Sequence, residues 1–117
     1  MSTQLAIETD HNSGICTVRI TGTLRSGADD DYVQEKGQEV KAMGCTRLLV
    51  DIRELHATGS SGIGFFVGLY TSLTRAGGRM VLAGPSKLVR EVLDLTRLST
   101  VIPIVDDVAA AKAFLVL

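Results

Sequence analysis

The sequence predicts an α/β domain with a mixed, mainly parallel sheet of about five strands and about four helices. Short apolar runs typical of strands alternate along the chain with segments in which apolar residues recur at helical spacing. Such alternation favours parallel strands joined by crossover helices. The chain has 117 residues, 45% of them hydrophobic, which is enough for a core, so we expect a single domain over residues 1–117.

The N-terminal part predicts two strands, at residues 5–8 and 15–20, with a hairpin connection at residues 11–14. This pair makes the sheet mixed, because a hairpin joins antiparallel strands. Residues 21–27 are expected to form a loop. A helix is predicted over residues 28–43, since acidic residues occupy its first turn and a glycine follows its last.

The centre of the chain predicts a buried strand at residues 48–52, in which Asp51 is the polar member. Residues 53–59 are expected to connect this strand to an apolar helix that ends at residue 75 or 76. Ser60 and Ser61 precede the apolar face of this helix, and a serine hydroxyl at such a point is a natural N-cap. A helix start also favours a bound anion, so capping and anion binding both remain open.

The last third predicts a strand at residues 79–83, a helix face over residues 88–95 and a strand at residues 101–105. Ser86 is the expected N-cap of the first of the two helices here, and Asp106 or Asp107 that of the final one. Pro103 lacks a backbone N–H, which favours an edge position for the strand that contains it.

Composition argues against several classes of function. The formal net charge of −1 gives no reason to expect a nucleic-acid partner, and no apolar run is long enough for membrane insertion. The first residues lack the features of a signal peptide, so we expect a cytoplasmic protein. Cys16 and Cys45 are isolated in the sequence and are predicted to be two buried, reduced thiols.

Motifs for catalysis, cofactors and metals fail at their informative positions. Gly59 and Gly64 have the spacing of a phosphate-binding loop, but Phe65 and Phe66 stand where the lysine and the hydroxyl residue belong. His56 has no marked acid to orient it as a base, and no histidines or cysteines have the spacing of metal ligands. The sequence therefore predicts a binding or switching module with no catalytic residues, cofactor or metal, rather than an enzyme.

Five ordered segments of the chain resemble the STAS domain, and within it most closely the bacterial anti-sigma factor antagonists. The clearest match is Ser-Ser-Gly-Ile-Gly at residues 60–64, which is similar to the family signature Asp-Ser-Ser-Gly-Leu-Gly. The other matching segments are residues 19–24, 49–55, 76–82 and 86–98.

The resemblance implies a regulator that is not an enzyme and that frees a sigma factor by binding its anti-sigma factor, usually also a serine kinase. It implies phosphorylation of Ser60 by that kinase, which adds nearly two negative charges at the contact surface, and reversal by a phosphatase. The partner-binding candidates surround Ser60 and are Thr23, Arg25, Thr58, Gly59, Ser61, Gly62 and Ile63.

Three positions depart from the family pattern and remove negative charge. Gly59 replaces an acidic residue before the phosphorylated serine, Thr23 a glutamate and Arg25 an aspartate. Arg25 is either a contact for a phosphate or an acidic partner, or a solvated loop residue. These departures keep open a second hypothesis, a STAS subunit of a lipid-transport or stress-signalling assembly without phosphorylation. A third is a small-ligand binder at the helix start.

Overall fold

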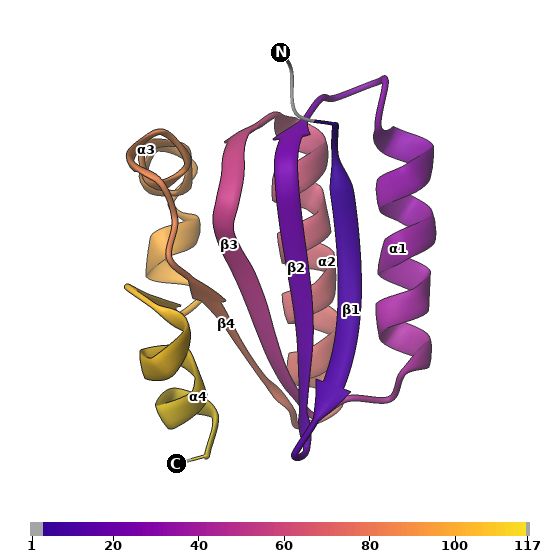
Figure 1. The fold of residues 1–117 in the computed structure, drawn as a ribbon, viewed down its shortest axis with the longest axis vertical. Helices are drawn as coiled ribbons and strands as arrows, with labels where there is room; N and C mark the ends of the chain where they lie inside the picture. Colours follow the sequence, from indigo (N-terminus) through magenta and orange to yellow (C-terminus); the bar gives the residue numbers. More distant parts are fainter. Residues whose placement is uncertain (1–3, 117) are drawn as a thin grey trace.

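The sheet has five strands in the order β1-β2-β3-β4-β5 in the computed structural model, which describes residues 4–116 (Figure 1). β1 is antiparallel to β2, and all the other neighbouring strands are parallel. The strands are β1 (Ala6–Asn12), β2 (Ile15–Leu24), β3 (Arg47–Thr58), β4 (Arg79–Ala83) and β5 (Ile104–Val105). The helices are α1 (Asp30–Ala42), α2 (Ser60–Arg75), α3 (Lys87–Leu95) and α4 (Val108–Val116), with a 3-10 helix at Leu98–Thr100. The predicted fold class is confirmed.

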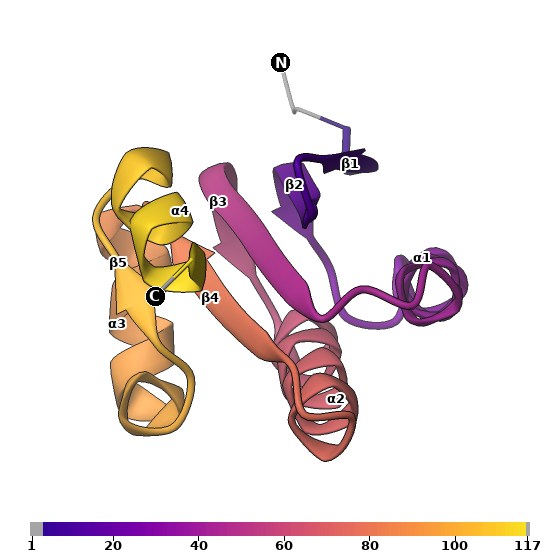
Figure 2. The ribbon, with the colours of Figure 1, turned by 90° about the horizontal axis from the view of Figure 1, so that it is seen from below.

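Helices cover both faces of the sheet, as Figure 2 shows, with α1, α2 and α3 on one face and α4 on the other. The first half of β3 and most of β4 are nearly continuous apolar runs, because these two strands are covered on both sides. The larger core, under α1 to α3, includes Val18, Val50, Phe66, Leu82 and Leu93. The smaller core, under α4, is formed by Ile15, Leu49, Val81, Ala83, Ala111 and Leu115.

Two central strands are longer than the sequence predicts. β2 continues through most of the predicted loop at residues 21–27, and β3 through nearly all of the predicted connection at residues 53–59. The reason is mutual pairing, because β2 and β3 remain paired, through two shifts of register, until Leu24 lies opposite Thr58. Gly22, with φ of 102°, lies where this register shifts.

The short connections also differ in detail from the prediction. The hairpin turn is only Ser13–Gly14, whose positive φ values of 55° and 78° suit the tight turn between twisted strands. The predicted strand at residues 101–105 shrinks to the two residues of β5, and Pro103 precedes this edge strand, as expected. Helices α1 and α2 begin at Asp30 and Ser60.

The predicted caps of the last two helices are confirmed. Ser86 Oγ accepts a hydrogen bond from the N–H of Val89 at 3.2 Å. Asp107 Oδ1 accepts one from the N–H of Ala110 at 2.7 Å. Each satisfies a backbone donor that the helix itself leaves without a partner.

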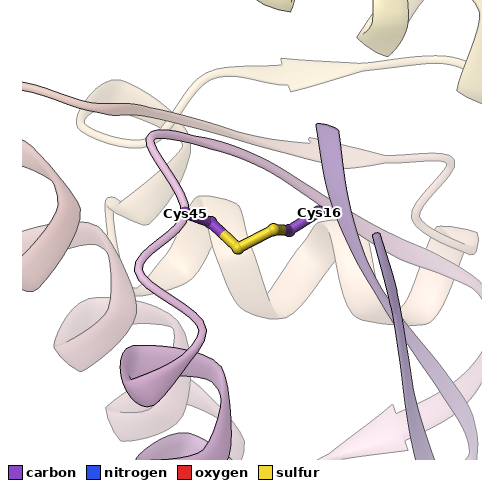
Figure 3. The surroundings of a disulfide bond; sticks show 2 residues. All are labelled: Cys16 and Cys45. Atoms are coloured by element: carbon purple, nitrogen blue, oxygen red, sulfur yellow. A yellow bond between two sulfur atoms is a disulfide. The ribbon is translucent and has the colours of Figure 1, made fainter. Parts of the chain in front are cut away.

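Cys16 and Cys45 form a disulfide, so the prediction of two reduced thiols is wrong (Figure 3). Cys16 lies in β2 and Cys45 in the connection that follows α1, with their Cα atoms 6.1 Å apart. Sequence spacing could not indicate this pair because 29 positions separate the two residues. The fold brings them together when α1 returns along the sheet to the start of β3.

Asp51 is the buried charge of the central strand, with 2% of its surface exposed. Its carboxylate accepts two hydrogen bonds from the Arg53 side chain, at 3.0 and 2.9 Å, and lies 3.5 Å from Arg19 Nε. Burial alone would raise the pKa of Asp51, but the hydrogen bonds and charge of Arg53, aided by Arg19, hold that pKa below its ordinary value. Asp51 is therefore a paired carboxylate that joins strands β2 and β3.

Candidate functional site

The carboxyl ends of β2 and β3 meet at one edge of the sheet because the two strands are parallel neighbours. The N–H of Gly59 donates to the carbonyl of Leu24 at 3.0 Å, which continues the pairing beyond the last strand residue. As a result, the β2–α1 loop, residues 25–29, lies beside the turn from β3 into α2. We call that turn, residues 59–62, the serine corner.

Ser60 is exposed and is the first residue of α2. Its hydroxyl is 3.0 Å from the hydroxyl of Ser26 in the β2–α1 loop. Ser26 Oγ also accepts a hydrogen bond from the N–H of Ser61 at 3.1 Å. One hydroxyl from the neighbouring loop thus contacts both serines of the corner.

The prediction that Ser60 or Ser61 caps α2 is wrong. The N-cap residue is Gly59, which has no side chain to accept a hydrogen bond, and both serines lie within the helix. The capping function passes to Ser26, which satisfies a backbone donor of the first turn. Gly59 leaves the space for this, because a Cβ at its position would overlap Ser26 Oγ.

Asp30, in the first turn of α1, connects the loop to the corner from the other side. Its Oδ1 accepts a hydrogen bond from the hydroxyl of Ser61 and another, at 2.9 Å, from the N–H of Gly27. The bond from Ser61, followed by that from Gly27, lowers the pKa of Asp30 from its ordinary value. The start of α1 is therefore held against the start of α2 by an ionised carboxylate.

The remaining predicted site residues lie around the serine corner and differ in how deeply they are buried. Arg25 is exposed in the β2–α1 loop, and its N–H donates to Asp29 Oδ2 at 2.6 Å. Thr23 and Thr58 are half-buried at the ends of β2 and β3. Ile63 is half-buried and packs on the larger core.

Gly62 is the one predicted contact residue that is buried. A Cβ at this position would overlap Thr58 Oγ1 and approach Leu24 Cδ1 to 3.1 Å. The glycine lets α2 pack closely on the strand ends, so its part in the corner is to shape the backbone.

A groove of about 290 Å³ leads away from the corner between α1 and α2. Asp30 and Ser61 line it at the corner, and Lys41 lines it near the end of α1. Phe65 and Leu69 contribute its apolar wall. A partner that contacts the corner can therefore also reach apolar surface between the two helices.

Sequence reasoning did not find Ser26 or Asp30 as members of the site. The acidic residues at 29–31 were predicted only to favour a helix start, and Ser26 only to lie in a loop. The available signal was topological, because loops that follow neighbouring parallel strands emerge at the same sheet edge.

The described residues hold no group of three or more histidine, cysteine, aspartate or glutamate side chains that could bind a metal ion. His56, which the sequence left as a weak candidate base, is an exposed residue of β3. The arrangement offers the exposed hydroxyl of Ser60 in a network of three serines and a carboxylate, on a surface shared by two helices.

The sequence matches the STAS domain over residues 6–111. The chain belongs to the STAS domain family. The anti-sigma factor antagonists of this family are regulatory proteins, generally without enzymatic activity, that interact with anti-sigma factors. No helix among residues 4–116 combines the length and the apolar character needed to cross a membrane.

Several proteins similar to this STAS chain are anti-sigma factor antagonists. It is 27% identical over 103 residues to an anti-sigma F factor antagonist of Paenibacillus polymyxa, and the match covers 88% of each chain. The crystal structure of an anti-sigma factor antagonist from Mycobacterium paratuberculosis superimposes with a TM-score of 0.88 at 17% identity, over 98% of each chain. The Bacillus protein SpoIIAA in its phosphorylated form gives a TM-score of 0.69 at 22% identity, over 93% of this chain and 99% of that one.

Proposed function

We propose that this protein is a partner-switching regulator of transcription that binds an anti-sigma factor and is released when a serine kinase phosphorylates Ser60. A phosphatase would restore the binding form. The single observation that carries the proposal is the exposure of Ser60 at the start of α2, inside the serine signature of a family of anti-sigma factor antagonists. SpoIIAA, a relative in structure, has been solved in a phosphorylated form.

Phosphorylation would change the serine corner in two ways. It replaces the Ser60 hydroxyl, which now contacts Ser26, with a group of about −1.5 to −2 charges and three acceptor oxygens. It also adds negative charge near the Asp30 carboxylate, which holds Ser61 in the same network. A partner that docks on the uncharged corner then meets both bulk and repulsion.

The partner surface in this proposal comprises the corner, the β2–α1 loop and the strand ends behind them. Arg25 supplies its positive charge, and Ile63 apolar area. Gly62 would take part through its backbone, because it is buried. The further contacts are Thr23, Thr58, Gly59 and Ser61.

The domain itself catalyses no reaction in this proposal and acts in the cytoplasm. The departures at Gly59 and Arg25 favour the second candidate, a STAS subunit of a lipid-transport or stress-signalling assembly that is not phosphorylated. The two candidates differ in whether charge at Ser60 controls a complex.

The test uses the chain with its cognate anti-sigma factor and ATP. Wild type should bind the anti-sigma factor and acquire one phosphate, and Ser60→Ala should bind without acquiring it. Ser60→Asp should bind at least about tenfold more weakly, since a charge at the contact surface opposes docking. Thr74→Asp is the matched control, because Thr74 is an exposed residue near the other end of α2 and should leave binding unchanged.

Equal affinities of wild type and Ser60→Asp, with the same circular dichroism spectra, would refute the switch. Absence of both a complex and a phosphate would favour the second candidate, which a pull-down from the native cell would then identify by its partners.

A further inference from the structure

We propose that Cys16 and Cys45 are a reversible thiol-oxidation site whose disulfide holds α1 and the β2–α1 loop against the serine corner. Its consequence for partner binding rests on the proposed function. Its effect on the loop does not, and can be measured on the protein alone.

The disulfide encloses the segment that completes the site. Residues 16–45 contain the rest of β2, the β2–α1 loop with Ser26, and the whole of α1 with Asp30. Ser26 and Asp30 are the residues of this segment whose side chains form hydrogen bonds with the serine corner. The covalent bond therefore closes a ring around one half of the hydrogen-bonded network.

Helix α1 has few other attachments. Its buried side chains are Val33 and Val40, and Gly37 in its middle adds no side chain to the core. The Tyr32 hydroxyl accepts a hydrogen bond from the N–H of Ile7 at 2.9 Å. A helix with so little buried apolar surface can open locally at a low free energy. We therefore expect the covalent bond near its end to contribute much of the stability of its packing against the sheet.

The two ends of α1 are fixed by different means. Asp30 attaches the N-terminal end to Ser61 through a hydrogen bond, and Cys45 attaches the segment after the C-terminal end to β2. Breaking the disulfide removes the covalent attachment and leaves the hydrogen bonds of Asp30 and Tyr32 and the packing of Val33 and Val40. The helix and the loop before it then gain freedom at the surface where Ser60 lies.

The two cysteines of the disulfide differ in exposure. Cys16 is 1% exposed, whereas Cys45 is half-buried and lies in the wall of a cavity of about 140 Å³. Lys41 lines the same cavity. An attacking thiolate would therefore reach the sulfur of Cys45 and expel that of Cys16.

The chemistry balances with ordinary cellular oxidants and reductants. Hydrogen peroxide takes two electrons from the two thiols, which form the Sγ–Sγ bond and release two protons, while its O–O bond breaks and two water molecules form. A dithiol reductant attacks Cys45 Sγ, forms a mixed disulfide and resolves it with its second thiol. The two protons end on Cys16 and Cys45.

The deciding experiment compares the wild-type protein in oxidised and dithiothreitol-reduced form by hydrogen exchange, with alkylation and mass spectrometry to count thiols. We expect two alkylated cysteines only after reduction, restoration of the disulfide by hydrogen peroxide, and exchange about tenfold faster over residues 25–42 in the reduced form. Strands β3 and β4 should remain the most protected part of the protein in both forms, because their amides exchange only through global unfolding. Cys16→Ser/Cys45→Ser should exchange like the reduced protein and should not respond to peroxide.

Unchanged exchange over residues 25–42 between the two forms would overturn the inference, as would alkylation of both cysteines after exposure to peroxide. The same two forms are then tested for binding to the anti-sigma factor. Binding that is equally tight in both overturns the regulatory consequence and leaves the proposed function intact. If neither form binds, the proposed function fails, and the exchange measurement still decides the inference.

Discussion

The contact between Gly59 and Ser26 predicts that substitutions at these two positions have strongly coupled effects on stability. A Cβ at position 59 would overlap Ser26 Oγ and lie 3.3 Å from the Cβ and N of Ser26. The φ of −94° at Gly59 is open to any residue, so Gly59→Ala introduces no backbone strain. Its main effect should be to displace the Ser26 hydroxyl.

The magnitude follows from the hydrogen bond that is lost. Ser26 Oγ accepts the N–H of Ser61, as an N-cap side chain does, and loss of such a cap costs typically about 1 kcal/mol. Gly59→Ala and Ser26→Ala should therefore each lower the free energy of unfolding by about 1 kcal/mol. Because both remove the same bond, the double variant should also lose about 1 kcal/mol, which is a coupling energy of about 1 kcal/mol in a double-mutant cycle.

Urea denaturation of wild type, the two single variants and the double variant measures the free energies of unfolding that make up this cycle. Gly64→Ala is the matched control, because Gly64 lies in the same helix and a Cβ there would meet nothing within 4 Å. That substitution should stabilise the protein, by up to about 1 kcal/mol. Strict additivity of Gly59→Ala and Ser26→Ala, at about 2 kcal/mol for the double variant, would refute the explanation that Gly59 makes room for a cap from the neighbouring loop.

Three other predictions concern stability. The double variant Cys16→Ser/Cys45→Ser should lose about 3.6 kcal/mol of unfolding free energy, which corresponds to the closure entropy of a loop of about 30 residues. Its melting temperature, measured by calorimetry without reductant, should fall by roughly 15 °C. A melting temperature equal to that of the oxidised wild type would show that the bond adds no stability. Asp51→Asn should cost about 1–2 kcal/mol at pH 7, since the Arg53 partner is half exposed. The folded pKa of Asp51 is lowered, so this difference should be complete above the ordinary value of 3.8 and shrink as the pH falls below it; denaturation at several pH values checks the sign. Gly62→Ala should cost about 1–3 kcal/mol through overlap with Thr58 Oγ1, and Thr58→Ala should recover part of that loss, which a second denaturation series measures.

The fold class was predictable because two independent patterns indicate it: short apolar runs typical of strands, and apolar residues at helical spacing. The segments at 48–52 and 79–83 are apolar on both faces, and helices with one apolar face follow them. The extents of β2 and β3 were not predictable, because residues 21–23 and 53–58 are mostly polar or glycine. Backbone pairing between neighbouring strands keeps those residues in the sheet, and no local propensity records that pairing.

The candidate site was predictable in part. Ser60 and its neighbours were identified from a local signature, because those residues are contiguous in the sequence. Ser26 and Asp30 come from a segment about 30 residues earlier and meet the corner only through the order of the strands. The same applies to the disulfide between Cys16 and Cys45, which depends on where α1 ends relative to the sheet.

The departure from the family pattern at position 59 changes which residue supplies the negative charge of the corner. An acidic side chain at position 59 would occupy the space of the Ser26 hydroxyl, so a side chain there and a cap from Ser26 exclude each other. With glycine at 59, the negative charge of the corner comes instead from Asp30, whose carboxylate binds the hydroxyl of Ser61. Because Asp30 belongs to α1, the charge beside the candidate phosphorylation site is attached to a separate and weakly buried helix. Whatever moves α1 must therefore also change the electrostatic surroundings of Ser60, which an acidic residue within the turn itself would have kept constant.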